Sequence, residues 1–232
     1  MNMFCYQCEQ TAQGTGCTVR GVCGKDPEAA ALQDLLVHAV KGVSMYAHRA
    51  AKLGAHDREV GRFVTEALFT TLTNVDFDAE RLAGYARRAA GMRDRARGLY
   101  KEACAHTGET PEELAGPAAW EPADDLEGLV RQGEEVTIEE RIEGLGDTVA
   151  GLQELIVYGI KGAAAYAYHA AVLDEEDDAL YAAFHELLDY VAGNPTDVDD
   201  LLAHALKTGE LNLEAMALLD AANTGAYGHP EP

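Results

Sequence analysis

The sequence predicts an all-α fold: two duplicated three-helix bundles preceded by a short cysteine-rich loop. Three observations predict this class. Four cysteines crowd into the first residues, apolar residues recur at helical spacing along most of the remaining chain, and one half of the chain repeats the other. No stretch alternates apolar and polar residues as a half-buried β-strand does. We therefore expect helices everywhere except in the first twenty-five or so residues.

The first helix has a distinct start. Asp26 stands at the N-cap, Pro27 at the first helical position and Glu28 in the first turn, which are the residue types preferred at those places. Apolar residues then follow at positions 32, 35, 36, 39, 40 and 43, the spacing of one helix face.

The second half repeats the first in register. Residues 32–53, LQDLLVHAVKGVSMYAHRAAKL, align without a gap with residues 152–173, LQELIVYGIKGAAAYAYHAAVL. The identical pairs include Lys41 with Lys161, Gly42 with Gly162, and Tyr46 with Tyr166. A repeat this long indicates a duplicated bundle. We expect the two bundles to superpose, with both glycines at close helix contacts where a Cβ atom would clash.

The chain therefore divides into five predicted segments: a cysteine-rich loop (1–25), a first three-helix bundle (26–106), an acidic connector (107–147), a second three-helix bundle (148–225) and an extended tail at a domain boundary (226–232). In the connector, Thr110 and Glu113 form a capping-box pattern that predicts a short helix. The last helix is predicted to break near Gly209.

The opening cysteines favour a metal site. Cys5, Cys8, Cys17 and Cys23 follow the pattern C-x2-C-x8-C-x5-C, with glycines between them. The odd total of five cysteines and the ample length of 232 residues argue against a disulfide framework. The intervals differ from those of common zinc ribbons and ferredoxins. The spacing leaves an iron–sulfur cluster, a zinc site and a redox-active thiol array open.

Charge and composition restrict the other roles. Forty acidic against eighteen basic residues give a net charge of −22, which disfavours nucleic acid and anionic membranes as partners. Residues 155–173 are the most membrane-like stretch, but Lys161 lies inside it, so a buried helix is the simpler interpretation. We expect a cytoplasmic protein without a secretory segment.

Other polar residues have plainer interpretations. We interpret most histidines as core or surface residues and Cys104 as a buried structural thiol. The matched Lys41–Lys161 and Tyr46–Tyr166 pairs are interpreted as packing residues retained from the duplication.

The opening motif and the helix behind it carry a family resemblance. The stretch FCYQCEQTAQGTGCTVRGVCGKDPEAAALQDLLVHAVKG resembles the start of the hybrid cluster proteins, also called prismane proteins or hydroxylamine reductases, and the likeness extends to the closing NTGAYGHPEP. The resemblance implies an N-terminal domain of two three-helix bundles. It also implies a [4Fe–4S] cubane, with Cys5, Cys8, Cys17 and Cys23 as its ligands.

The resemblance also implies a division of labour. Family members continue into further domains that hold the catalytic hybrid cluster, and nothing in this chain corresponds to them. We therefore expect an iron–sulfur electron-transfer module that serves a redox partner protein or the remaining hybrid-cluster domains, and no catalytic residues here. The alternative is a non-redox, metal-stabilised helical scaffold for protein interaction.

Overall fold

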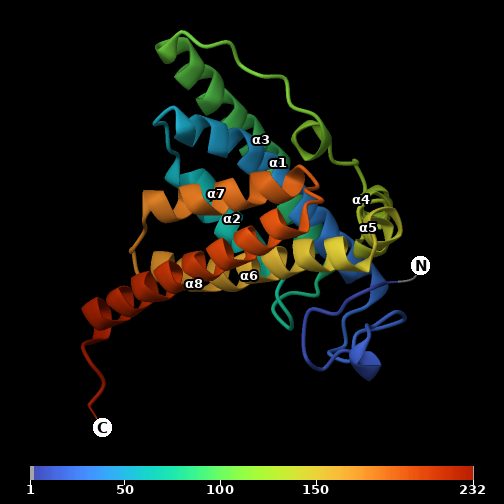
Figure 1. Ribbon diagram of the computed structural model, residues 1–232. Coiled ribbons are helices and arrows are strands. Elements are labelled where there is room, and N and C mark those ends of the chain that lie inside the picture. Colours follow the sequence, from blue (N-terminus) through green and yellow to red (C-terminus); the bar gives the residue numbers. More distant parts are fainter. Residues whose placement is uncertain (1–2, 232) are drawn as a thin grey trace.

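A computed structural model describes residues 3–231 of the chain. Residues 1, 2 and 232, at the ends of the predicted loop and tail, lie outside the described residues. The α-helices of this part are α1 (Pro27–Lys52), α2 (Arg58–Thr70), α3 (Ala79–Thr107), α4 (Leu126–Glu134), α5 (Ile138–Leu145), α6 (Asp147–Val172), α7 (Asp178–Ala192) and α8 (Val198–Tyr227), with short 3-10 turns η1 (Ala12–Gly14) and η2 (Gly116–Ala119) (Figure 1). Residues 3–231 contain no β-strand, so the predicted all-α class is confirmed.

Aspartates begin most of the helices. The side chain of Asp26 accepts a hydrogen bond from the Ala29 N–H at 2.8 Å, which confirms the predicted start of α1. Such a cap satisfies one of the backbone donors that the first turn leaves without a partner. The N-caps of α2, α3, α4, α7 and α8 are Asp57, Asp78, Asp125, Asp177 and Asp197.

The repeat is visible in the helices. α1 and α6 each contain 26 residues, and each is followed by a shorter and then a longer helix. Gln33 and Gln153 occupy matching positions and make the same kind of hydrogen bond to a backbone carbonyl. The side-chain amide of Gln33 donates to the carbonyl of Asp76 at 2.8 Å, and that of Gln153 donates to the carbonyl of Pro195 at 2.9 Å.

The helices that pack together do not follow chain order. α1 packs along α3 and then along α7, whereas α6 packs along α8 and then along α2. Ser44 of α1 is hydrogen bonded to His185 of α7 at 3.1 Å. Phe69 of α2 stacks on Tyr168 of α6, with ring centroids 5.5 Å apart. The second helix of each repeat therefore lies chiefly against the first helix of the other repeat, which the predicted bundles of consecutive helices did not anticipate.

α2 and α7 meet each other through equivalent residues. Arg58 forms an ion pair with Asp178 at 2.7 Å, and the two residues are 120 positions apart. Gly61 faces Tyr181, where a Cβ atom on the glycine would come within 2.4 Å of the ring. Contacts between equivalent residues are those expected near a twofold axis relating two copies.

The connector is structured, but not where the sequence predicted. Residues 110–115 contain no helix, so the predicted capping box at Thr110 is wrong, while α4 and α5 lie further along the chain. α4 and η2 pack on α1, and α5 packs on α6. The buried Arg93 of α3 fixes the segment because it donates to the carbonyl of Trp120 and pairs with Glu121 at 2.8 Å.

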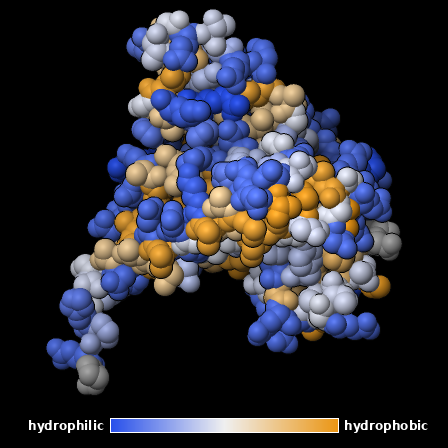
Figure 2. Space-filling view, in the orientation of Figure 1, coloured by the Kyte–Doolittle hydropathy of each residue, from blue (hydrophilic) through white to orange (hydrophobic). Residues whose placement is uncertain are grey.

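α8 is one continuous helix. The predicted break near Gly209 is wrong, and no atom lies close to the position of a Cβ on that exposed residue. Apolar side chains gather on the outer surface over α8 (Figure 2). They include Leu202, Leu206 and Leu213, which are 47%, 75% and 68% exposed.

None of the helices within residues 3–231 combines the length and apolar character needed to cross a membrane. The stretch 155–173, singled out above, lies within α6 and the residue that follows it. Its Lys161 is buried against the rest of the protein.

Candidate functional site: the cysteine loop and the adjoining cleft

The cysteine loop is folded around a pairing of Cys5 with Cys17. The Cys5 N–H donates to the Cys17 carbonyl at 3.1 Å, and the Cys17 N–H donates back at 2.8 Å. The turn η1 lies between them. At Gly16 the backbone has a φ of 150°, and a Cβ atom there would come within 2.6 Å of the Phe4 ring. Only glycine fits this close approach.

Aromatic and polar contacts attach the loop to the helices. The ring of Tyr6 meets Phe4 edge-on at 5.0 Å and Tyr158 of α6 at 5.8 Å. On the other side, the Thr73 hydroxyl donates to Gln7 Oε1 at 3.0 Å. Figure 1 shows the loop beside the start of α1 and the start of α6. The loop is therefore positioned by both repeats.

The thiol of Cys17 lies among hydrogen-bond donors. Its Sγ accepts the Ala12 N–H at 3.4 Å and lies 3.7 Å from the Thr11 hydroxyl. The backbone N–H groups of Ala12 and Val22 lower the pKa of the Cys17 thiol. A donor-rich setting favours the thiolate, which is the form that binds metals.

A buried cation adds to this setting. Lys25 is 5% exposed, and its Nζ lies 4.0 Å from the Sγ of Cys5 and 5.9 Å from the centre of the Phe77 ring. The loop thus places a cation beside one of its four thiols.

The four predicted ligands share the loop but do not form a compact group. In residues 3–231, no three His, Cys, Asp or Glu side chains are placed so that they hold one metal ion. Cys17 is buried, whereas Cys5, Cys8 and Cys23 are partly exposed. Cys104 is fully buried in the main hydrophobic core, as predicted for a structural thiol.

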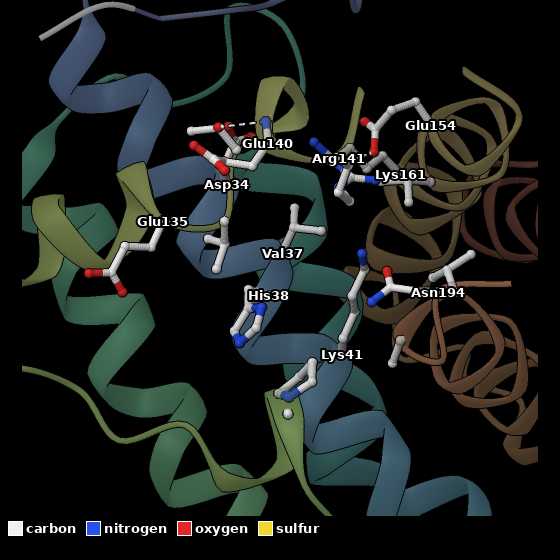
Figure 3. A pocket seen from close by; sticks show the side chains of 17 residues that line it. Asp34, Val37, His38, Lys41, Glu135, Glu140, Arg141, Glu154, Lys161 and Asn194 are labelled. Carbon is white, nitrogen blue, oxygen red and sulfur yellow. Dashed lines mark hydrogen bonds and ion pairs between the residues drawn. The ribbon is translucent and has the colours of Figure 1, made fainter. Parts of the chain in front are cut away.

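A cleft of about 280 Å³ lies between α1, α6 and the connector. Figure 3 shows Asp34, His38 and Lys41 along α1 on one side, with Glu154 and Lys161 of α6 on the other. Asp34 and Glu154 occupy matching repeat positions, as do Lys41 and Lys161. The interpretation of the lysines as mere packing residues is therefore incomplete, because both line this cleft.

Burial shifts the proton equilibria of these groups. Burial raises the pKa of Asp34 to about 6. It lowers the pKa of Lys41 and Lys161 to about 8 and that of His38 to about 4. Glu154, which is 3% exposed, is paired with Arg141 of α5. No short sequence motif marks this set of residues. The one sequence signal that could have found it is the match of charged positions between the two repeats.

The cleft approaches the cysteine loop. A small cavity of about 20 Å³ lies between them, lined by Cys5 and Lys25 on the loop side and by Asp34, Glu154 and Lys161 on the cleft side. Tyr158 lines it too, and burial raises the pKa of that phenol. The charged residues of the cleft therefore lie directly behind the cysteine loop, around this small cavity.

The chain belongs to the Prismane/CO dehydrogenase family, whose family model matches residues 3–232. The hydroxylamine reductase of Rhodospirillum rubrum is 50% identical over 230 residues, which are 99% of this chain and 42% of that protein. The hydroxylamine reductase of Acidithiobacillus ferrooxidans is 50% identical over 233 residues, with the same coverage. That of Halothermothrix orenii is 46% identical over 234 residues, which are 41% of its length.

The similarity is thus to one part of a longer protein. The chain spans about two fifths of the length of the curated relatives it matches. The resemblance inferred from the opening motif is confirmed at the level of the family. Iron–sulfur metal cofactors are characteristic of the prismane proteins, and the loop offers the four thiols that such a cofactor needs.

Proposed function

We propose that the chain is an iron–sulfur electron-transfer module, in which Cys5, Cys8, Cys17 and Cys23 hold a [4Fe–4S] cluster. Four thiolates are the usual ligands of such a cluster, which accepts and donates one electron at a time. The observation that carries the proposal is the cysteine loop itself, which supplies four thiols, two of them beside hydrogen-bond donors, in a chain of this family.

The donor set fits the proposed cofactor chemically. Hydrogen bonds and positive charge near the sulfur atoms offset the negative charge of a thiolate-bound cluster and help to set its potential. The Ala12 N–H beside Cys17 and the Lys25 ammonium beside Cys5 supply both.

We further propose that the module passes electrons to a catalytic centre elsewhere, either in hybrid-cluster domains or in a redox partner protein. Reduction of hydroxylamine requires two electrons and protons at an open metal position. Four thiolates would already occupy a cluster held by this loop, and the fifth cysteine, Cys104, is sealed in the core. The chain is proposed to work inside the cytoplasm.

Replacement of single cysteines tests the ligation. Cysteine-to-serine changes at positions 5, 8, 17 and 23 should each lower the iron content and the visible absorption of protein reconstituted anaerobically with iron and sulfide. Cys104→Ser is the matched control and should leave both unchanged. Iron loss in the control together with retention in Cys17→Ser would contradict the assignment. A colourless protein that contains zinc would support the scaffold alternative instead.

A second assay tests the relay role. The reconstituted chain should accept electrons from dithionite, with loss of absorption, but should show no appreciable oxidation of reduced viologen when hydroxylamine is added. A complete hydroxylamine reductase provides the positive control. Comparable rates per cluster would place catalysis on this loop and overturn the relay proposal.

A further inference from the structure

Two buried lysines face the cleft without a counter-ion of their own. Lys41 of α1 is 8% exposed and Lys161 of α6 is 5% exposed, and both line the cleft. Within residues 3–231 neither ammonium takes part in a hydrogen bond or an ion pair, although Lys161 lies 5.7 Å from the centre of the Tyr158 ring. An ammonium group has three donors, and burial without acceptors is costly.

The neighbouring acids do not balance this charge. Arg141 already pairs with Glu154, and Asp34 is then the one remaining acid among the inner lining residues of α1 and α6. Glu135 and Glu140 also line the cleft but are exposed to solvent at its rim. The inner cleft thus has three cationic side chains and two acids, an excess of one positive charge.

The remaining wall is apolar. Val37, Val136, Val157 and Val191 line the cleft together with Pro117. The volume of about 280 Å³ is close to the lower end of ligand-binding pockets, which run from roughly 300 Å³ upward. Such a space accepts a small molecule with a carbon skeleton and is too large for a lone inorganic ion.

From this arrangement we propose that the cleft between α1 and α6 binds a small monocarboxylate. Its carboxylate is held by the ammonium groups of Lys41 and Lys161, and its aliphatic part lies against the valines. A single negative charge matches the excess of the inner cleft, whereas Asp34 would repel a phosphate dianion. The proposed site requires no cluster, although its Asp34 and Lys161 also line the small cavity that reaches Cys5.

The charged groups around the ligand give binding a defined pH dependence. A bound anion favours the protonated lysines, so affinity should fall as the pH rises through about 8, where both lysines lose their protons. Asp34 adds repulsion as it ionises near pH 6. His38, whose pKa burial lowers to about 4, is neutral across this range. The other charged groups that line the cleft are Arg141, Glu135, Glu140 and Glu154.

Calorimetric titration with butyrate tests the site. We expect one butyrate per chain at pH 7, an affinity at least about tenfold weaker in Lys41→Met and in Lys161→Met, and no change in Lys101→Met, a control on an exposed lysine of α3. Lys41→Arg, which keeps the charge, should retain part of the binding. Circular dichroism checks that each variant is folded.

Two further arms need no variant. The affinity of the wild-type chain for butyrate should fall by about tenfold between pH 7 and pH 9, and inorganic phosphate and butylammonium should bind more weakly than butyrate at pH 7. The proposal would be overturned if butyrate does not bind, or if both methionine variants bind butyrate as tightly as the wild type does. Tighter binding of phosphate than of butyrate would also overturn it.

Discussion

The two repeats share a helix pattern but differ in what covers them. The connector elements η2 and α4 lie against the first repeat, where the Pro117 carbonyl packs over Gly42 of α1. On α8 of the second repeat, Leu206 and Leu213 remain 75% and 68% exposed. Counted from the N-caps Asp78 of α3 and Asp197 of α8, the matching residues of α3 are the exposed Arg87 and Asp94. Duplication has therefore preserved the inward faces of the helices, while the outward faces have taken on different properties.

The matched glycines give the largest expected difference between the repeats. A Cβ atom at Gly42 would come within 2.1 Å of the Pro117 carbonyl oxygen, whereas at Gly162 the nearest atom is Asn212 Oδ1 at 3.5 Å. Gly42→Ala should lower the free energy of unfolding by about 1–3 kcal/mol through overpacking. Gly162→Ala should raise it by up to about 1 kcal/mol, because alanine favours helix. Denaturant unfolding of both variants measures this, and equal effects would contradict the asymmetry.

At the lysines the repeats should behave alike. In the folded chain burial lowers the pKa of Lys41 and Lys161 to about 8 from the ordinary 10.5. Between pH 8 and 10.5 the unfolded state therefore binds more protons than the folded state, so this pair makes the protein more stable as the pH rises. Lys41→Met and Lys161→Met should each reduce that rise. The measurement is the free energy of unfolding as a function of pH for each variant and for the wild type. Equal slopes in variant and wild type would contradict the prediction.

The outer face of α8 should give the smallest effect on stability. Leu206→Arg and Leu213→Asp introduce the residues that α3 carries at the matching positions. Each change should alter the free energy of unfolding by less than about 0.5 kcal/mol, since both side chains are exposed. The same variants should bind less of a hydrophobic dye such as ANS. A large loss of stability would show that α8 depends on this face for its packing.

The sequence predicted the helix class, the start of α1 at Asp26 and the register of the repeat, because caps and periodicity are local signals. It did not predict which helices pack together. Duplicated helices have nearly the same apolar faces, so the apolar face of α2 can pack against α6 as well as against α1. The apolar periodicity of the sequence therefore cannot distinguish the two pairings. The break predicted at Gly209 failed for a related reason: a single exposed glycine costs a helix only about 1 kcal/mol.

The cysteine loop was recognisable from the sequence, whereas the surroundings of the loop were not. The spacing of four cysteines marks a loop, and Lys25 and Ala12 stand close to it in the chain. The cleft behind the loop combines residues of α1, α5 and α6, and no local pattern indicates that Asp34 and Arg141 share one cavity. The match of charged residues across the repeat could have indicated a common location, but the matched lysines were interpreted as packing residues.

The crossed pairing of α1 with α7 and of α6 with α2 affects how the polypeptide emerges during synthesis. When the ribosome has released the residues up to Thr107, α1 still lacks its partner α7 and α2 still lacks α6. Apolar faces on the nascent first half therefore remain uncovered until about seventy further residues have been translated, several seconds at ordinary elongation rates. Contacts between such distant segments also slow folding in general. We therefore expect the first half to expose apolar surface for longer than the second half during synthesis.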